Sequence, residues 1–383
     1  MTNLQEAICN LQLNNNLVIL RTCGGERQKE LLSSLTQDYT TVDLSLPNLR
    51  LQAQQNPQLF AEGLRLPVYL ANLQYVPDLL PALLSEKLIL GKILASCSQS
   101  YYLEKLAAQT NAGRAAFVEL PLQDAASAAR KPFVPQEEYL QGLPGAAKQR
   151  AIVSAILGEQ AAYSAWVRRV LQQDIMEQTT VSDGMKFYRF LCAVASMTGC
   201  VVNYTILANN VGITAPTAKQ WLQFLAGTGL VYFLQPVERV EGKRLVKAPK
   251  VYFREAGAAA YLLQLHDGAS LLQSVYFKNL YENYVVSALR ESYLLWGELP
   301  AFRFYRDSNN KEISLLVQAQ GALYPVMICQ ETFSANRLSK CFELLPGYAA
   351  EQGLQLGIGC VITLGGECRQ VSGGLWQVNA AVL

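Results

Sequence analysis

The chain has 383 residues, a length that suggests two or three domains with ample room for buried cores. Charged residues make up 16% of it, against about 25% in an average soluble protein, and the net charge is +2. A chain with 51% apolar residues is not disordered, and one this neutral is not a histone-like nucleic-acid binder. The single histidine, His266, excludes two-histidine zinc motifs and relays that need two imidazoles, and we expect it at a helix end or on the surface.

The nine cysteines form no Cys-x-x-Cys pair and their spacing is irregular, which predicts neither a zinc ribbon nor a disulfide framework. We interpret them as small core residues in a reducing compartment and expect no bound metal. The first 16 residues have no cationic start and no apolar stretch typical of a signal peptide. Since no run of about 18 apolar residues occurs either, a cytoplasmic protein without membrane contact is predicted.

Short apolar strands alternate with helical stretches in residues 1–123. Leu17–Leu20 is a buried-strand run, and a turn and a helical stretch, Glu26–Leu35, follow it. Further strands are predicted at Thr40–Asp43, Pro67–Leu70 and Lys92–Ala95. This alternation is typical of an α/β layer with a parallel sheet.

The middle of the chain is predicted to be mostly helical. Residues 124–180 read as a helical linker, and residues 181–265 show a compact three-helix rhythm. Asn203 and Thr214 are placed to cap the second and third helices, which a Gly-containing turn separates. This is a helix-turn-helix signature. Strands at Leu230–Leu234 and Lys250–Phe253, joined by a charged loop, are predicted to form a wing.

Residues 266–383 are again predicted to be α/β. Helices are expected at Phe277–Tyr293 and Ala335–Ala350. The expected strands are Phe302–Tyr305, Ile313–Val317, Tyr324–Ile328, Gly359–Leu364 and Leu375–Val378.

An ordered set of short motifs runs through most of the chain. Its members are Ala112-Gly113-Arg114, Gly142-Leu143-Pro144, Gln173-Asp174-Ile175, Phe190–Ala195 with Gly199, Lys247–Phe253 and Leu280–Asn283. In this order the chain resembles a family of bacterial and archaeal AAA-type ATPases with a C-terminal domain of unknown function. The resemblance implies a P-loop domain, then a winged helix, then a domain like the restriction-endonuclease core.

The phosphate-binding loop of that family is degenerate here. A P-loop reads Gly-x-x-x-x-Gly-Lys-[Ser/Thr], whose backbone N–H groups, lysine and hydroxyl hold phosphate and magnesium. Against this pattern the opening glycine becomes Arg21, and Gly24 and Gly25 remain. The closing residues become Glu26, Arg27 and Gln28. We expect the basic side chains of this loop to be exposed, with anion binding at the start of the following helix as the alternative.

The acids of the Walker B strand are also replaced. The matching segment is Pro67–Asp78, and the two acids that would hold magnesium and activate water become Ala71 and Asn72. Hydrolysis by the family mechanism should therefore be lost. Arg114, in the Ala-Gly-Arg motif, is expected to make a structural ion pair or helix contact, the alternative being contact with a phosphate or a neighbouring subunit.

The nuclease-like signature of the C-terminal region is degenerate as well. The Glu-x-Asp pattern falls on Glu312 and Ser314, and the Glu-x-Lys pattern falls on Met327 and Cys329. The acid expected on the preceding helix falls on Ala288. One carboxylate does not make a magnesium site, so a second activity is predicted to be lost.

The third helix of the predicted winged helix carries polar residues suited to phosphates or base edges, namely Thr217, Lys219, Gln220 and Gln223. The segment from Glu238 to Glu255 has a local net charge of +3, with the basic residues Arg239, Lys243, Arg244, Lys247, Lys250 and Arg254. DNA contact and use as a packing module between two α/β domains stay open as alternatives.

The sequence thus predicts a catalytically inactive AAA-family pseudoenzyme that acts as a scaffold for a protein partner or DNA, with no cofactor required. A relative that retains ATP and Mg²⁺ binding with little hydrolysis is one alternative. A winged-helix DNA-binding regulator is the other.

Overall fold

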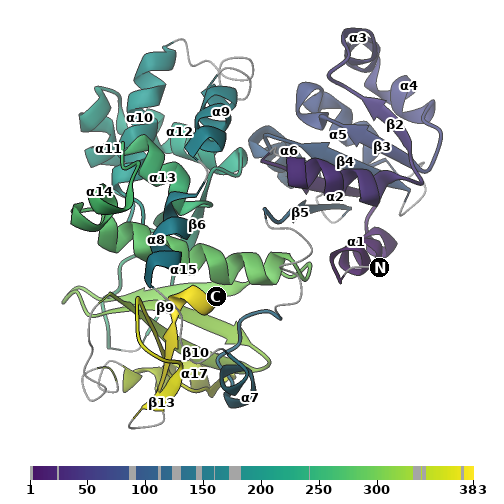
Figure 1. The fold of residues 1–383 in the computed structure, drawn as a ribbon. Helices are drawn as coiled ribbons and strands as arrows, with labels where there is room; N and C mark the ends of the chain where they lie inside the picture. Colours follow the sequence, from purple (N-terminus) through teal and green to yellow (C-terminus); the bar gives the residue numbers. More distant parts are fainter. Residues whose placement is uncertain are drawn as a thin grey trace.

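The computed structural model describes residues 3–23, 26–85, 92–110, 114–122, 131–143, 149–158, 160–171, 183–240, 242–330, 338, 342–371 and 375–383. The fold is mixed α/β, with one parallel sheet and one larger mixed sheet. Figure 1 shows the first sheet and its helices beside a group of middle helices, with the second sheet below those helices. The long helix α15 (Phe277–Leu294) runs between the middle helices and the second sheet.

The N-terminal unit is a five-stranded parallel sheet in the order β2-β3-β4-β1-β5. Its strands are β1 (Leu17–Arg21), β2 (Thr40–Asp43), β3 (Val68–Ala71), β4 (Ile93–Cys97) and β5 (Ala115–Glu119). Its helices are α1 (Asn3–Asn14), α2 (Glu26–Thr36), α3 (Pro47–Gln55), α4 (Pro57–Glu62), α5 (Leu80–Leu83) and α6 (Tyr101–Gln109), with the short 3-10 turns η1 (Leu73–Tyr75) and η2 (Pro77–Leu79). The four strands named from the sequence are confirmed, and β5 was missed.

The register of this sheet decides which residues meet. Arg21 pairs with Cys97 of β4 and with Glu119 of β5, so the carboxyl ends of these three strands form one edge. β1 lies inside the sheet, between β4 and β5, and its first four residues are fully buried. Such an uninterrupted apolar run is typical of a parallel strand that is covered on both faces.

The described middle part of the chain is mostly helical and contains the two strands β6 (Val231–Pro236) and β7 (Lys250–Phe253). Its helices are α7 (Glu137–Gln141), α8 (Gln149–Leu157), α9 (Gln160–Arg169), α10 (Gly184–Ser196), α11 (Tyr204–Val211), α12 (Ala215–Gly227), α13 (Ala256–Leu262) and α14 (Gly268–Gln273). The caps predicted at Asn203 and Thr214 are confirmed, because their side chains accept hydrogen bonds from the N–H groups of Ile206 and Thr217.

The second sheet joins the C-terminal strands to β6 and β7, in the order β13-β14-β12-β10-β9-β8-β6-β7, with β11 beside β10. Its C-terminal strands are β8 (Ala301–Arg306), β9 (Glu312–Ala319), β10 (Ala322–Cys329), β11 (Gln355–Leu356), β12 (Cys360–Thr363), β13 (Arg369–Val371) and β14 (Leu375–Asn379). The helix α17 (Leu345–Glu351) and the 3-10 turn η6 (Ala380–Val382) complete the region. Residues 335–337 and 339–341 of the helix predicted at Ala335–Ala350 lie outside the described residues, and its last part is confirmed as helix α17, which starts at Leu345.

The segment predicted as a wing is tied to this second sheet. β6 pairs with β7 on one side and with β8 on the other. The loop that follows β6 is held as well, since the N–H of Val237 donates to the carbonyl of Phe304 at 2.8 Å and the N–H of Val246 to that of Arg306 at 3.0 Å. These bonds hold both ends of the loop against β8, where a free wing would project into solvent.

The buried cores follow the same division. Two clusters of buried side chains lie within the N-terminal unit, one on each face of its sheet. A much larger cluster runs from Phe133 to Val382, so the middle helices and the second sheet share one core. Among the described residues no helix is both long and apolar enough to cross a membrane.

Candidate functional site

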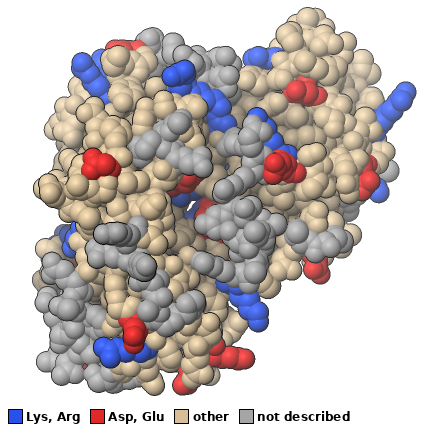
Figure 2. Space-filling view, viewed as in Figure 1, with Lys and Arg blue, Asp and Glu red and all other residues tan. Residues whose placement is uncertain are grey.

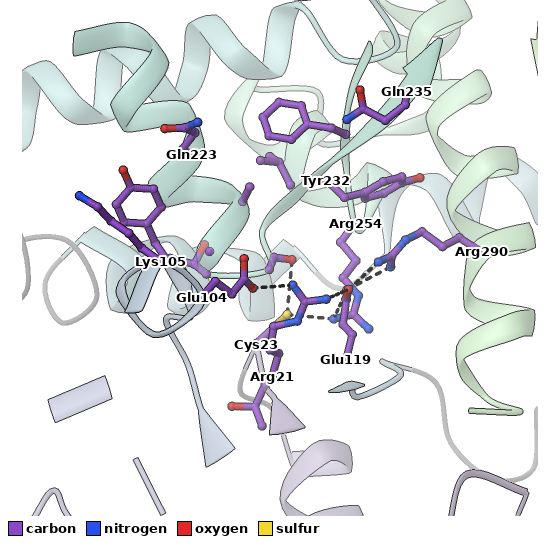
Figure 3. Close-up of a pocket in the computed structure, with 18 residues that line it drawn as sticks. Arg21, Cys23, Glu104, Lys105, Glu119, Gln223, Tyr232, Gln235, Arg254 and Arg290 are labelled. Atoms are coloured by element: carbon purple, nitrogen blue, oxygen red, sulfur yellow. Dashed lines mark hydrogen bonds and ion pairs between the residues drawn. The ribbon is translucent and has the colours of Figure 1, made fainter. Parts of the chain in front are cut away.

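A cavity of about 550 Å³ lies where the N-terminal unit meets the rest of the molecule. The carboxyl ends of β1 and β5 and helix α6 form one wall, and α12, β6 and α15 form the other (Figure 3). In open α/β sheets ligands bind outside the carboxyl ends of the strands. The volume is also within the usual range for small-molecule sites, so this cavity is the candidate site.

Glu119, the last residue of β5, is the centre of an ion-pair network beside this cavity. Its carboxylate accepts hydrogen bonds from Arg290 of α15 at 3.0 Å and pairs with Arg254, which follows β7, at 2.9 Å. Arg21, at the end of β1, approaches it at 3.2 Å. Burial alone raises the pKa of Glu119, but Arg290, Arg254 and Arg21 outweigh it and hold that pKa well below its usual range.

A second buried carboxylate extends the network. Glu291 of α15 accepts from Nε of Arg254 at 2.9 Å and from the backbone N–H of Leu122 at 2.9 Å. Arg254 also donates to the carbonyl of Leu120 and, at 3.2 Å, to the sulfur of Cys23. The network (Figure 3) therefore joins the N-terminal sheet to the core that the middle helices and the second sheet share, called the second core below. The side chains of Glu119, Arg254 and Glu291 that make this link are nearly inaccessible to water.

The degenerate loop after β1 is closed by the protein's own groups. The side-chain oxygen of Gln28 accepts from the N–H of Cys23 at 2.8 Å, and its amide nitrogen donates to the carbonyls of Leu120 and Pro121. Arg169 of α9 donates to the carbonyl of Cys23. Gln28 thus takes a backbone N–H of the kind that a working loop presents to phosphate.

The other residues of this loop are placed only in part. Gly24 and Gly25 lie outside the described residues, and Glu26 and Arg27 open α2 with side chains that are likewise outside them. Arg21 was expected to be exposed, and that expectation is wrong. Only 28% of its side chain is accessible, because it lies between Glu104 of α6 at 3.0 Å and Glu119.

The side chain at the Walker B position, Asn72, also forms hydrogen bonds within the protein. Ala71 ends β3, and Asn72 follows it with a left-handed backbone, φ 62°. The side chain of Asn72 donates to Asp43 at 2.9 Å and accepts from Gln74. Asp43, at the end of β2, is thus the carboxylate that lies beside this position. Burial raises its pKa, yet the hydrogen bonds from Asn72 and Ser45 lower it on balance.

Arg114 lies at the opposite edge of the sheet. It precedes β5, and its carbonyl accepts from the N–H groups of Asn16 and Leu17 at the start of β1. The five residues of β5 separate it from Glu119, about 16 Å at the usual rise of a strand. Arg114 therefore lies well away from Glu119 and the cavity, and both its expected structural contact and the alternative of a phosphate or subunit contact stay predictions.

Helix α12 presents the predicted nucleic-acid residues unequally. Lys219 and Gln220 are exposed, whereas Thr217 is half-buried with its hydroxyl 2.8 Å from that of Thr214. Gln223 is half-buried and faces the cavity. The end of α12 is docked on the N-terminal unit, since Tyr101 of α6 lies against the ring of Phe224.

The basic segment after β6 has fewer exposed basic side chains than its composition suggests. Arg239, Lys243, Arg244 and Lys247 are exposed. Lys250 and Arg254 are only 1% and 2% exposed and form internal ion pairs. On the face drawn in Figure 2, basic and acidic side chains of the described residues are scattered among each other.

One residue of the nuclease-like signature, Glu312, lies against a buried lysine. Nζ of Lys250 lies 2.5 Å from Glu312 of β9 and 2.7 Å from Glu282 of α15. The acid that α15 places beside Lys250 is Glu282, and the assignment of the signature's helix position to Ala288 stays a prediction. The two acids bind Lys250 between them, and Arg306 also contacts Glu312, at 3.4 Å.

The remaining positions of that signature carry no acid or lysine. The buried hydroxyl of Ser314 accepts from the N–H of Ile328. Met327 and Cys329 are half-buried on β10, and burial raises the pKa of the Cys329 thiol. His266 is exposed between α13 and α14, as expected. The described part of the chain holds no group of three or more acidic, cysteine or histidine side chains placed to bind a metal.

Comparison with known proteins gives three results. A family model described as a domain of unknown function, DUF8612, matches residues 142–269. The uncharacterized proteins Mb2031c of Mycobacterium bovis and Rv2008c of Mycobacterium tuberculosis are each 25% identical over 276 residues, 70% of this chain. The match spans 60% of the length of these relatives. The Walker-type ATPase PABY2304 of Pyrococcus abyssi is similar over 68% of this chain and 94% of its own, with 13% identity and a TM-score of 0.34.

Proposed function

We propose that this protein is a relative of the P-loop ATPases that has lost hydrolysis and acts as a binding scaffold. The observation that carries the proposal is the closed loop after β1, in which the Gln28 amide takes the N–H of Cys23. Magnesium binding and water activation would need acids at the end of β3, where Ala71 and Asn72 stand.

The residues present do not fit ATP with Mg²⁺ in the family manner. No hydroxyl residue follows Arg27, and the Gln28 side chain that replaces it is 3% exposed and points back into the sheet. Asp43, the nearest carboxylate to Asn72, is already engaged by the Asn72 amide. We therefore derive no hydrolytic step through a nucleotide at this loop.

The scaffold part of the proposal rests on the ion-pair network around Glu119. It joins the N-terminal sheet to the core shared by the middle helices and the second sheet through the chain's own ion pairs, which favours a fixed arrangement of the two. A scaffold that presents a fixed surface to a partner needs this property, whereas a nucleotide-driven machine must change shape.

An ATPase assay tests the proposal. With about 1 mM ATP and Mg²⁺, the purified protein is expected to release phosphate at the same background rate as an Arg27→Ala variant. Turnover by the wild-type protein that disappears in Arg27→Ala would show an active site and end the proposal. Small-angle scattering with and without ATP and Mg²⁺ gives a second readout, in which an unchanged profile is expected.

DNA binding is the second candidate function. Lys219 and Gln220 on α12 are exposed, and so are Arg239, Lys243 and Arg244 on the loop after β6. Recognition helices contact bases with residues near their N-terminus, which is the part of α12 that the N-terminal unit leaves open. Contacts with only a few phosphates predict weak DNA binding, whose affinity falls as the salt concentration rises.

Fluorescence anisotropy with a labelled duplex tests this candidate. Binding at about 50 mM salt is expected to weaken in Lys219→Glu and in Arg244→Glu, and to disappear at about 200 mM salt. Lys92→Glu, an equal charge change on an exposed residue at the far edge of the N-terminal sheet, is the control. Absence of binding at low salt would remove the candidate.

A further inference from the structure

The cavity beside the Glu119 network has a chemical character of its own, apart from the closed loop. It lies between two units of the molecule and has about the volume of a small organic ligand. Its charged lining consists of four basic side chains, Arg21, Lys105, Arg254 and Arg290, and two acidic ones, Glu104 and Glu119. The lining is therefore positive.

Both carboxylates of the lining are already saturated. Glu119 is held by Arg21, Arg254 and Arg290. Glu104 accepts from Arg21 at 3.0 Å and from the hydroxyl of Ser100 at 2.8 Å. An incoming cation would have to displace an arginine from one of these carboxylates.

The basic side chains, in contrast, keep free donors. Lys105 of α6 is exposed at the cavity and, within the described residues, forms no ion pair or hydrogen bond. Nε of Arg21 is buried and likewise has no partner there. Both groups lie on the wall that the N-terminal unit contributes (Figure 3). Free charged donors beside saturated acceptors favour an anion.

Apart from Arg254 and Arg290, which are bound to Glu119, the opposite wall is uncharged. Gln223 of α12 and Gln235 of β6 contribute amide groups to the lining, and Phe233 adds an apolar surface. Tyr232 is not available for stacking, because Arg290 covers one face of its ring at 4.6 Å and Tyr252 stacks on it at 5.7 Å. An inorganic ion would leave most of this wall without contact.

We propose that this cavity binds a small organic anion, whose carboxylate or phosphate group pairs with Lys105 and Arg21 and whose uncharged part contacts Gln223, Gln235 and Phe233. Such a ligand bridges the N-terminal unit and the second core, so its binding strengthens the arrangement of the two. The proposal does not depend on hydrolysis, and it uses none of the degenerate loop residues after Cys23.

Thermal unfolding of the full chain with defined probes tests it. Citrate represents the carboxylates and glucose 6-phosphate the phosphate esters, each up to about 10 mM against NaCl of matched ionic strength. At least one probe is expected to raise the Tm in proportion to the logarithm of its concentration. Lys105→Glu, at an exposed position, is expected to weaken the apparent Kd about tenfold or more.

The control is Lys92→Glu, which makes the same charge change at the other edge of the same sheet and should retain wild-type binding. A wild-type shift that Lys105→Glu leaves unchanged would overturn the proposal, as would no shift with either probe. Inorganic phosphate alone matching glucose 6-phosphate would show an ion site and contradict the organic ligand. A shift seen only with ATP and Mg²⁺ would overturn it in favour of nucleotide binding, whereas failure of the scaffold proposal appears separately as ATP turnover.

Discussion

Gln28 holds the peptide of Cys23 from inside the molecule, with its side-chain oxygen 2.8 Å from the Cys23 nitrogen. The same amide donates to the carbonyls of Leu120 and Pro121, which follow β5. A single side chain therefore links the loop after β1 to the segment after β5, the neighbouring strand in the sheet. The Gln28 side chain thus satisfies a backbone N–H at the start of the loop, as a bound phosphate does in a P-loop.

Replacing Gln28 by alanine should therefore destabilise the fold. The change removes the partner of the buried N–H of Cys23 and of the carbonyl of Pro121, whereas the carbonyl of Leu120 keeps Arg254, and each buried group left without a partner costs about 1–3 kcal/mol. We expect the free energy of unfolding to fall by about 2 kcal/mol or more in urea denaturation. Gln54→Ala on the exposed surface of α3 is the control and should change it by less than about 0.5 kcal/mol. Equal effects would show that the loop does not need the amide.

Glu119→Gln tests the network that joins the two cores. The substitution leaves Arg254 and Arg290 buried without their common counter-ion, which typically costs about 3–5 kcal/mol. Glu104→Gln, which removes a 45% exposed partner of Arg21, should cost less than about 1 kcal/mol. The unfolding free energies of the two variants in urea give the comparison. Similar values would mean that the buried network contributes no more than a surface pair.

The stability that Glu119 provides should depend on pH in one direction. Its pKa is lowered in the folded protein, so the folded state favours the ionised carboxylate. The contribution is complete above the unfolded-state pKa, near 4.5, and is lost as the pH falls below it toward the folded-state pKa. The difference in unfolding free energy between the wild-type protein and Glu119→Gln should be constant from pH 7 to about 5 and shrink by pH 3. A difference that grows on acidification would contradict this sign.

Lys250 on β7 is a second buried charged group that, like Glu119, lies between partners of opposite charge. Burial lowers its pKa, but Glu282 and Glu312 raise it on balance, so the ammonium stays charged between them. Lys250→Met leaves Glu282 without its counter-ion, while Glu312 keeps Arg306 at 3.4 Å, and should cost about 3–5 kcal/mol. Adding Glu282→Gln should recover part of this loss, because one uncompensated charge is then removed. Additive losses in urea denaturation of the single and double variants would disprove the coupling.

Local sequence patterns predicted most of the helices and strands that carry the site residues, but not the contacts between those residues. The capping residues Asn203 and Thr214 act within three residues of their own position, so their role is readable from sequence. Strand β5 was missed because its apolar run is short and directly follows the Ala-Gly-Arg motif. Its last residue, Glu119, is the centre of the site, and its partners Arg254 and Arg290 lie more than 130 residues away in sequence.

The assignment of Lys250 and Arg254 to an exposed basic segment failed for a related reason. Lysine and arginine are mostly exposed in proteins, and composition alone gives no sign that distant acids bury them. Lys250 meets Glu282 and Glu312 only because β7 lies beside α15 and joins the sheet that contains β9. The absence of acids at Ala71 and Asn72 was readable position by position, because it needed no knowledge of the partners, and the loss of hydrolysis inferred from it stays a prediction.

Gly229 offers a test of how closely the N-terminal unit approaches the turn after α12. Its φ is +70°, and a Cβ added there would lie 2.6 Å from Sγ of Cys23. Gly242 has nearly the same φ, +68°, but a Cβ there would meet nothing within 4 Å. Gly242→Ala should thus cost only the backbone strain, about 1–2 kcal/mol, whereas Gly229→Ala pays this strain and must also displace the thiol. Adding Cys23→Ala to Gly229→Ala removes the clashing sulfur, so the double variant should be more stable than the sum of the single losses predicts. Urea denaturation of these four variants decides the matter, since equal losses at the two glycines would mean that Cys23 and Gly229 are not in contact.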